Sequence, residues 1–297
     1  MEKYIIICVA GQSNAVGYDE SPVTEENLYC ADPNRIKQLG FLGEDNLKVV
    51  PLDYCAQSMQ NLRVYNRADD KYPGTKGIHL PLANLLLPHI PEDYGLLFLS
   101  VAYGGCGFTV GQDAAYDSVQ KKPVDSPETG QPGPYRWGKD TAYYQTLRDR
   151  IVHALSMNPE NRFGAFLWCQ GENDSEDPDG HYKGFCEMTE QLFEELNHGD
   201  LKNRPLTGKW DKDLWYNMET VFYWYTVGQC TQIWENYKHW NPDTYIPIPR
   251  SVPSNEINGT GETAQNRDAH FGDNSYEKII APLVLEKLLA NNTLNFR

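Results

Sequence analysis

The stretch YIIICVAGQSNAVG, residues 4–17, decides how the rest of the sequence is interpreted. Its apolar, β-branched beginning, residues 4–7, is typical of a strand that is buried on both faces. The chain must then turn sharply, because Gly11 and Gly17 bracket a short polar segment. A serine on such a strand-to-helix turn presents its hydroxyl beside backbone N–H groups that can bind an anion. This is the geometry of an acyl-transfer nucleophile, although an ordinary βα turn explains the stretch alone equally well.

Composition and charge limit the number of domains and the kinds of partner that we expect. The 297 residues suffice for one large α/β domain with long loops or for two small domains. The formal net charge of -15 argues against a nucleic-acid partner and against docking on an anionic membrane. No apolar run is long enough to span a membrane, and the N-terminus lacks the features of a signal peptide. We therefore expect no membrane partner and synthesis in the cytoplasm.

The seven cysteines contain no C-x-x-C motif, and three of them lie beside apolar, strand-like runs. We interpret them as reduced core thiols, and we predict neither a disulfide framework nor a metal site.

Apolar segments recur along the chain as they do in an α/β protein. Strands are expected at 4–7, 95–101, 163–168 and 245–249, the last at a sheet edge because of its prolines. Helices are expected at 80–90, 141–157, 181–198, 229–240 and 276–290. The intervening residues 19–79, 109–140 and 250–275 are predicted to be mainly loops. This alternation predicts a mainly parallel sheet with helices on both faces.

Gly-rich or polar turns follow three of the expected strands, around Ser13, Gly105 and Asn173. Ligands of open parallel sheets bind beside the carboxyl ends of the strands. We therefore expect these three turns to meet in one crevice.

Four short motifs resemble, in order, the blocks of the SGNH (GDSL-like) hydrolase superfamily. They are GQSN at 11–14, GG at 104–105, QGEND at 170–174 and DAHF at 268–271. More narrowly, they resemble those of the sialate O-acetylesterase-like carbohydrate esterases, whose first block reads G-Q-S-N. The resemblance implies a flavodoxin-like three-layer α/β/α sandwich with a mainly parallel sheet and long loops. It also implies a single esterase domain over residues 1–297.

The resemblance assigns roles to individual residues. Ser13 would be the nucleophile that forms an acyl-enzyme, and His270 would be the general base. The oxyanion would be held by the backbone N–H groups of Ser13 and Gly105 and by the side-chain amide of Asn173. No metal and no cofactor are implied.

The sequence departs from the family pattern at the acid behind His270. The family's last block is D-x-x-H, whereas Arg267 stands three residues before His270 and Asp268 stands two before it. Asp268 is the expected triad acid. A backbone carbonyl and a more distant acid such as Glu262 are the alternatives.

The predicted function is removal of O-acetyl groups from carbohydrate, either a bacterial surface polysaccharide or sialic acid. Two alternatives stay open: an esterase or thioesterase for a lipid-like acyl substrate, and an inactive glycan-binding or adhesion module of the same fold. Glu172 and Asp174 also suggest a two-carboxylate glycosidase, but the esterase motif already accounts for both residues. The aromatic-rich segment 210–240 fits core packing or a sugar platform.

The long aromatic loops give the chain a further resemblance to esterase domains of bacteriophage tail spikes. That resemblance implies action outside the cell or in a virion tail, as a homo-oligomer or as part of a larger tail assembly.

The histidines other than His270 receive structural interpretations. His79 is expected to be a hydrogen-bonded core or loop residue. The others lie in or beside helices and loops, and the sequence suggests no partner for them: His89, His153, His181, His198 and His239.

Overall fold

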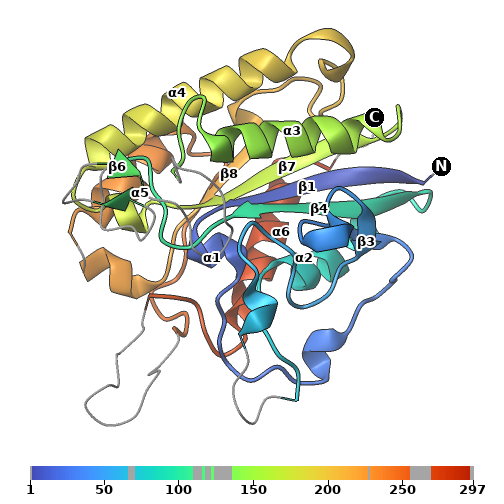
Figure 1. The fold of residues 1–297 in the computed structure, drawn as a ribbon, viewed down its shortest axis with the longest axis horizontal. Helices are drawn as coiled ribbons and strands as arrows, with labels where there is room; N and C mark the ends of the chain where they lie inside the picture. The colour runs from blue at the N-terminus through green and yellow to red at the C-terminus, as the bar shows by residue number, and fades with distance from the viewer. Residues whose placement is uncertain are drawn as a thin grey trace.

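A seven-stranded sheet forms the centre of the protein in a computed structural model (Figure 1). The structure describes residues 2–65, 71–109, 136–226, 228–254 and 269–294, and the backbone of a small hairpin, β5 (Tyr116–Asp117) and β6 (Lys122–Pro123). In spatial order the strands of the large sheet are β3 (Val49–Pro51), β2 (Ile36–Leu39), β4 (Tyr94–Ala102), β1 (Lys3–Gly11), β7 (Arg162–Cys169), β8 (Trp215–Met218) and β9 (Tyr245–Ile246).

All neighbouring strands of this sheet are parallel except β2 and β3, which form an antiparallel edge. Without that edge pair, the strands β4-β1-β7-β8-β9 have the 2-1-3-4-5 order of flavodoxin-like folds. In such sheets the strand order reverses between the first and third strands, here β1 and β7. The Ser13 turn follows β1 and the Asn173 turn follows β7, so both lie at this point of reversal.

Helices cover both faces of the sheet, as Figure 1 shows. One face carries α3 (Ala142–Ser156), α4 (Pro178–Leu196) and α5 (Cys230–Trp240), which pack against alternate β1 residues such as Ile6 and Cys8. The other face carries α2 (His79–Leu86) and α6 (Ala281–Ala290), which pack against Ile5 and Ile7. β1 is therefore buried on both faces, which explains its uninterrupted apolar sequence.

Local capping explains where the two longest helices begin. The Thr141 side chain accepts a hydrogen bond from the backbone N–H of Tyr144 at the start of α3. Asp177 does the same for Gly180 at the start of α4, and Pro178 occupies the first turn. Both starts lie close to those expected from the apolar periodicity.

The observed fold confirms the α/β sandwich and the expected helices, and it places β9 at the sheet edge. Three short strands were not predicted. The aromatic segment contains β8, and the mainly irregular stretch 19–79 supplies the β2–β3 pair. Most of the predicted loop 109–140 lies outside the described residues.

The cysteines are all free, and five of the seven are buried, as expected for core thiols. In the described ranges, no helix is both long enough and apolar enough to cross a membrane.

Candidate active site

The turn after β1 brings Ser13 to the carboxyl edge of the sheet. Gly11 has a φ of +135°, and a Cβ atom at this position would lie 2.1 Å from the carbonyl oxygen of Cys169. The backbone N–H of Gln12 donates to that same carbonyl over 3.0 Å. Glycine is thus required for the first strand to turn directly against β7. Ser13 opens the short helix α1 (Ser13–Val16) and is 7% exposed.

The glycine turn after β4 lies beside Ser13. A Cβ atom on Gly104 would be 3.5 Å from the Cβ of Ser13, which is an ordinary contact distance, so the two turns lie side by side. Gly105 has a φ of +71°. The indole N–H of Trp137 donates to the Gly11 carbonyl, and its backbone N–H donates to Gly107, which ties the two turns together.

The turn after β7 brings a third polar group to the same edge. The side-chain nitrogen Nδ2 of Asn173 is buried and has no hydrogen-bond partner among the described residues. The backbone N–H of Asn173 lies 3.4 Å from Oε1 of Gln12. The amide of Gln170 donates to the carbonyl of Cys106 over 2.9 Å, so this turn is joined to both others.

The segment 269–271, here called the His270 loop, is hydrogen-bonded to Asn14, the residue after Ser13. Asn14 donates through Nδ2 to the carbonyl of Ala269 over 3.2 Å, and its Oδ1 accepts from the backbone N–H of Phe271 over 3.3 Å. The imidazole of His270 also stacks on the ring of Tyr18, with centroids 4.6 Å apart and an interplanar angle of 21°. Asn14 thus holds the backbone on both sides of His270.

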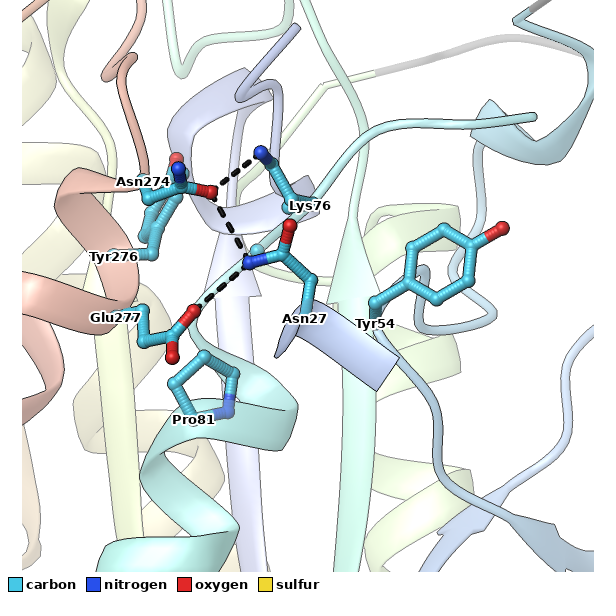
Figure 2. A pocket seen from close by; sticks show the side chains of 8 residues that line it. Asn27, Tyr54, Lys76, Pro81, Asn274, Tyr276 and Glu277 are labelled. Carbon is cyan, nitrogen blue, oxygen red and sulfur yellow. Dashed lines mark hydrogen bonds between the residues drawn. The ribbon is translucent and has the colours of Figure 1, made fainter. Parts of the chain in front are cut away.

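A small polar cavity lies beside the segment that follows His270 (Figure 2). Asn274 accepts from Lys76 Nζ over 2.6 Å and from Asn27 over 3.1 Å, and Asn27 also donates to Glu277. The cavity volume of about 20 Å³ accommodates one water molecule and is too small for a sugar. We therefore interpret it as part of the scaffold that follows His270.

A larger cavity, of about 260 Å³, lies elsewhere. Asp213 and Asp243 in its lining precede β8 and β9, so it borders the amino ends of these strands, away from the serine turn.

The structure therefore gathers Ser13, Gly105, Asn173 and His270 at one edge of the sheet, as the motifs predicted. Their catalytic roles stay predictions. The expected triad acid Asp268 and the alternative Glu262 both lie outside the described residues.

A buried pair that was not predicted from the sequence lies next to this site. His181 Nδ1 lies 2.6 Å from Asp174 Oδ2, and its Nε2 lies 2.6 Å from the hydroxyl of Tyr237. The Asp174 carboxylate also accepts from the backbone N–H groups of Phe108 and Thr109. Burial alone would raise the pKa of Asp174, but the contact with His181 and the backbone N–H groups of Phe108 and Thr109 together outweigh it and lower that pKa. The only signal in the sequence was an acid in the turn and a histidine at the start of the next helix.

The other buried acid of the third turn is held by protein groups as well. Oε1 of Glu172 accepts from Asn14 over 2.9 Å and from the Thr220 hydroxyl over 2.8 Å. Burial raises the pKa of Glu172. These contacts fit a structural role and give no support to a two-carboxylate glycosidase.

His79 occupies the core position that was expected. Burial lowers its pKa to about 4. The expected hydrogen bond is not found, because neither ring nitrogen has a partner among the described residues.

The flavodoxin-like sheet and the serine, glycine, amide and histidine segments at its edge define an SGNH-type hydrolase fold. No protein-family model matches the sequence. The chain is 32% identical over 238 residues to a protein of Escherichia coli (strain K12) named "Probable 9-O-acetyl-N-acetylneuraminic acid deacetylase", an alignment that covers 74% of this chain and 68% of the relative.

Solved structures show the same likeness. The crystal structure of NanS matches with a TM-score of 0.76 at 26% identity and covers 97% of both chains. A protein from Arabidopsis thaliana has a TM-score of 0.61 at 13% identity over 97% of this chain and 98% of its own, which shows a shared fold. The chain belongs to the sialate O-acetylesterase-like family of SGNH hydrolases and is a carbohydrate O-acetylesterase.

Proposed function

We propose that the protein removes the 9-O-acetyl group from sialic acid, with Ser13 as nucleophile and His270 as general base. The observation that carries this assignment is the pair of hydrogen bonds from Asn14 to the backbone on either side of His270. The side chain next to the nucleophile thereby fixes the loop that carries the base. The substrate is taken from the name of the Escherichia coli relative.

The reaction would proceed through an acetyl-enzyme. Oγ of Ser13 attacks the acetyl carbonyl carbon while His270 accepts the hydroxyl proton. The tetrahedral intermediate collapses, the sugar oxygen leaves, and His270 returns the proton to it. A water molecule, deprotonated by the same histidine, then attacks the acetyl carbonyl carbon. The bond from this carbon to Oγ of Ser13 breaks, acetate is released, and His270 returns the proton to Oγ.

The oxyanion of this intermediate would be held by the backbone N–H groups of Ser13 and Gly105 and by Nδ2 of Asn173. This role is supported by Nδ2 of Asn173, which is buried and has no hydrogen-bond partner among the residues that the structure describes. A buried donor that lacks an acceptor is costly in the resting protein. The cost is recovered when an oxyanion forms in front of it, so the donor binds the transition state more strongly than the ground state.

We also propose Asp268 as the acid that orients His270, with Glu262 or a backbone carbonyl as alternatives. The stacking of His270 on Tyr18 supports the assignment of the histidine, because it restricts the imidazole plane. An acid or carbonyl would then only have to select the tautomer.

The alternatives are less well supported. A lipid-like acyl substrate is not favoured by the carbohydrate-deacetylating relatives. An inactive glycan-binding module would not account for Nδ2 of Asn173, which is buried with no hydrogen-bond partner among the described residues. Action outside the cell or in a virion tail, as a homo-oligomer or within a larger tail assembly, stays a prediction.

The test is acetate release from 9-O-acetyl-N-acetylneuraminic acid and from p-nitrophenyl acetate. Ser13→Ala and His270→Ala should each lower kcat about a thousandfold or more. Asn173→Ala should lower kcat about 100- to 1000-fold. Ser156→Ala, a serine at the end of α3, serves as the matched control. Full activity of Ser13→Ala would contradict the mechanism.

A further inference from the structure

A group of four aromatic side chains and one arginine borders the His270 loop. The aromatic residues Phe222, Tyr223, Trp224 and Tyr225 belong to the 3₁₀ helix η8 (Phe222–Thr226), which follows β8. Arg250 follows β9, the next strand of the sheet. We call these five residues the aromatic rim. Because β8 and β9 are parallel to β1 and β7, the rim lies at the same carboxyl edge as Ser13.

The inner end of the rim is joined to the catalytic segment. Asn14 Nδ2 lies 2.7 Å from the hydroxyl of Thr220, two residues before η8. The indole N–H of Trp224 donates to the carbonyl of Ala269 over 2.9 Å. The residue before the proposed base is therefore held by the rim on one side and by Asn14 on the other.

The outer end of the rim faces solvent. Phe222 is 41% exposed and Tyr223 is 39% exposed. Exposed aromatic rings that are fixed in place offer flat apolar faces, which suit the apolar face of a sugar ring. The rim is also rigid, because Tyr225 donates to the buried carboxylate of Glu219, which further binds Tyr245 and the backbone N–H of Ile248.

Arg250 places a positively charged guanidinium next to two of these rings. Its Cζ lies 5.6 Å from the ring centre of Phe222 and 5.4 Å from that of Tyr225. The side chain is exposed, and the described residues provide neither an ion pair nor a hydrogen bond to its guanidinium. A guanidinium that contacts rings through its face keeps its edge N–H donors available for a carboxylate.

The net negative charge of the whole chain suggests that Arg250 binds an anionic substrate. At a net charge of -15, the protein repels an anionic substrate unless a local cation offsets the field. A sialic acid carries its carboxylate at the ring end, whereas the 9-O-acetyl group lies at the tip of the side chain. When the acetyl group is held beside Ser13, the ring and the carboxylate must extend outward from the crevice.

We propose that the aromatic rim is the subsite for the acidic sugar ring, and this rests on the proposed function. Arg250 binds the carboxylate through paired N–H···O bonds, and the exposed rings of Phe222 and Tyr223 contact the sugar. The subsite selects anionic over neutral acetylated sugars and contributes to binding without entering the acetyl-transfer step.

The decisive variant is Arg250→Gln, which removes the charge and keeps a polar side chain. We expect the ratio of kcat/KM for 9-O-acetyl-N-acetylneuraminic acid to kcat/KM for p-nitrophenyl acetate to fall about 10- to 100-fold, mainly through KM. Arg250→Lys should recover part of the loss. Added salt should raise KM for the acidic sugar in the wild type more than in Arg250→Gln.

The matched control is Arg162→Gln, which makes the same charge change at the amino end of β7. An unchanged ratio in Arg250→Gln, or an equal fall in Arg162→Gln, would overturn the subsite.

A second measurement separates this proposal from the catalytic one. N-acetylneuraminic acid is titrated calorimetrically into Ser13→Ala and into the double variant Ser13→Ala/Arg250→Gln, where no turnover is needed. At least about tenfold weaker binding to the double variant supports the subsite even if the catalytic assignment fails. Equal affinities overturn the subsite and leave the catalytic assignment standing.

Discussion

His181 and Asp174 are in direct contact, with Nδ1 2.6 Å from Oδ2, and both side chains are completely buried. The same carboxylate accepts hydrogen bonds from Phe108 and Thr109, three and four residues after Gly105. The pair therefore connects the amide turn after β7 to the glycine turn after β4. Both turns supply proposed oxyanion donors, so the separation of these donors depends on a contact that does not itself touch substrate.

Asp174→Asn should lower the free energy of unfolding by about 3–5 kcal/mol, because His181 and two backbone N–H groups would lose a buried anion. Chemical denaturation measures the change. Asp149→Asn, whose side chain pairs with Arg148 on the surface, should cost less than about 1 kcal/mol. Similar losses of unfolding free energy in the two variants would show that the buried pair stabilises the protein no more than the surface pair does.

The same pair predicts a pH dependence of stability. The pKa of Asp174 is lowered from its ordinary value of 3.8, so the folded protein favours the ionised form. Its stabilising contribution is complete above that value and is lost as the pH falls through the lower pKa of the folded state.

The measurement is the difference in unfolding free energy between the wild type and Asp174→Asn at a series of pH values. The difference should shrink as the pH falls below about 4. Taking the difference cancels the opposite contribution of Glu172, whose pKa is raised. If this difference grows as the pH falls, the pKa of Asp174 is not lowered in the folded protein.

Asn14→Ala should lower kcat about 10- to 100-fold, because the backbone on both sides of His270 loses its hydrogen bonds to Asn14. Steady-state kinetics with p-nitrophenyl acetate measure this effect. Asn27→Ala is the control, since Asn27 lines the small cavity and contacts Asn274 in the segment after His270 (Figure 2). Wild-type kcat in Asn14→Ala would exclude this positioning role.

Tyr18→Leu removes the ring on which the imidazole of His270 stacks. We expect kcat/KM to fall about 3- to 10-fold, which corresponds to the usual strength of an aromatic pair. Tyr18→Phe keeps the ring and should retain most of the activity. Equal losses in both variants would point to the hydroxyl in place of the stacked ring.

Gly11→Ala should prevent proper folding or cost more than about 3 kcal/mol, because the new methyl group would meet the Cys169 carbonyl oxygen at 2.1 Å. Thermal unfolding of the soluble fraction is the measurement. Gly199→Ala is the control: Gly199 also has a positive φ, +55°, but no atom lies within 4 Å of its added Cβ. That variant should cost only about 1–2 kcal/mol.

The sequence by itself determined the features that depend on neighbouring residues. A continuous apolar run with glycines after it predicts a buried strand and a tight turn, and β1 and Gly11 confirm both. Apolar residues at helical spacing predict α3 and α4 because one face of each helix must be buried. The order of the four motifs predicted which residues would meet at the edge of the sheet.

Only the tertiary structure decided the features that join distant segments. β8 is four residues long and buried throughout, so its sequence lacks the alternation that distinguishes a strand from other core segments. The bonds from Asn14 to the His270 loop span more than 250 residues, and His181 meets Tyr237 from another helix. Such contacts are fixed by how the sheet and its helices pack, because each residue alone is compatible with many partners until the fold excludes all but one.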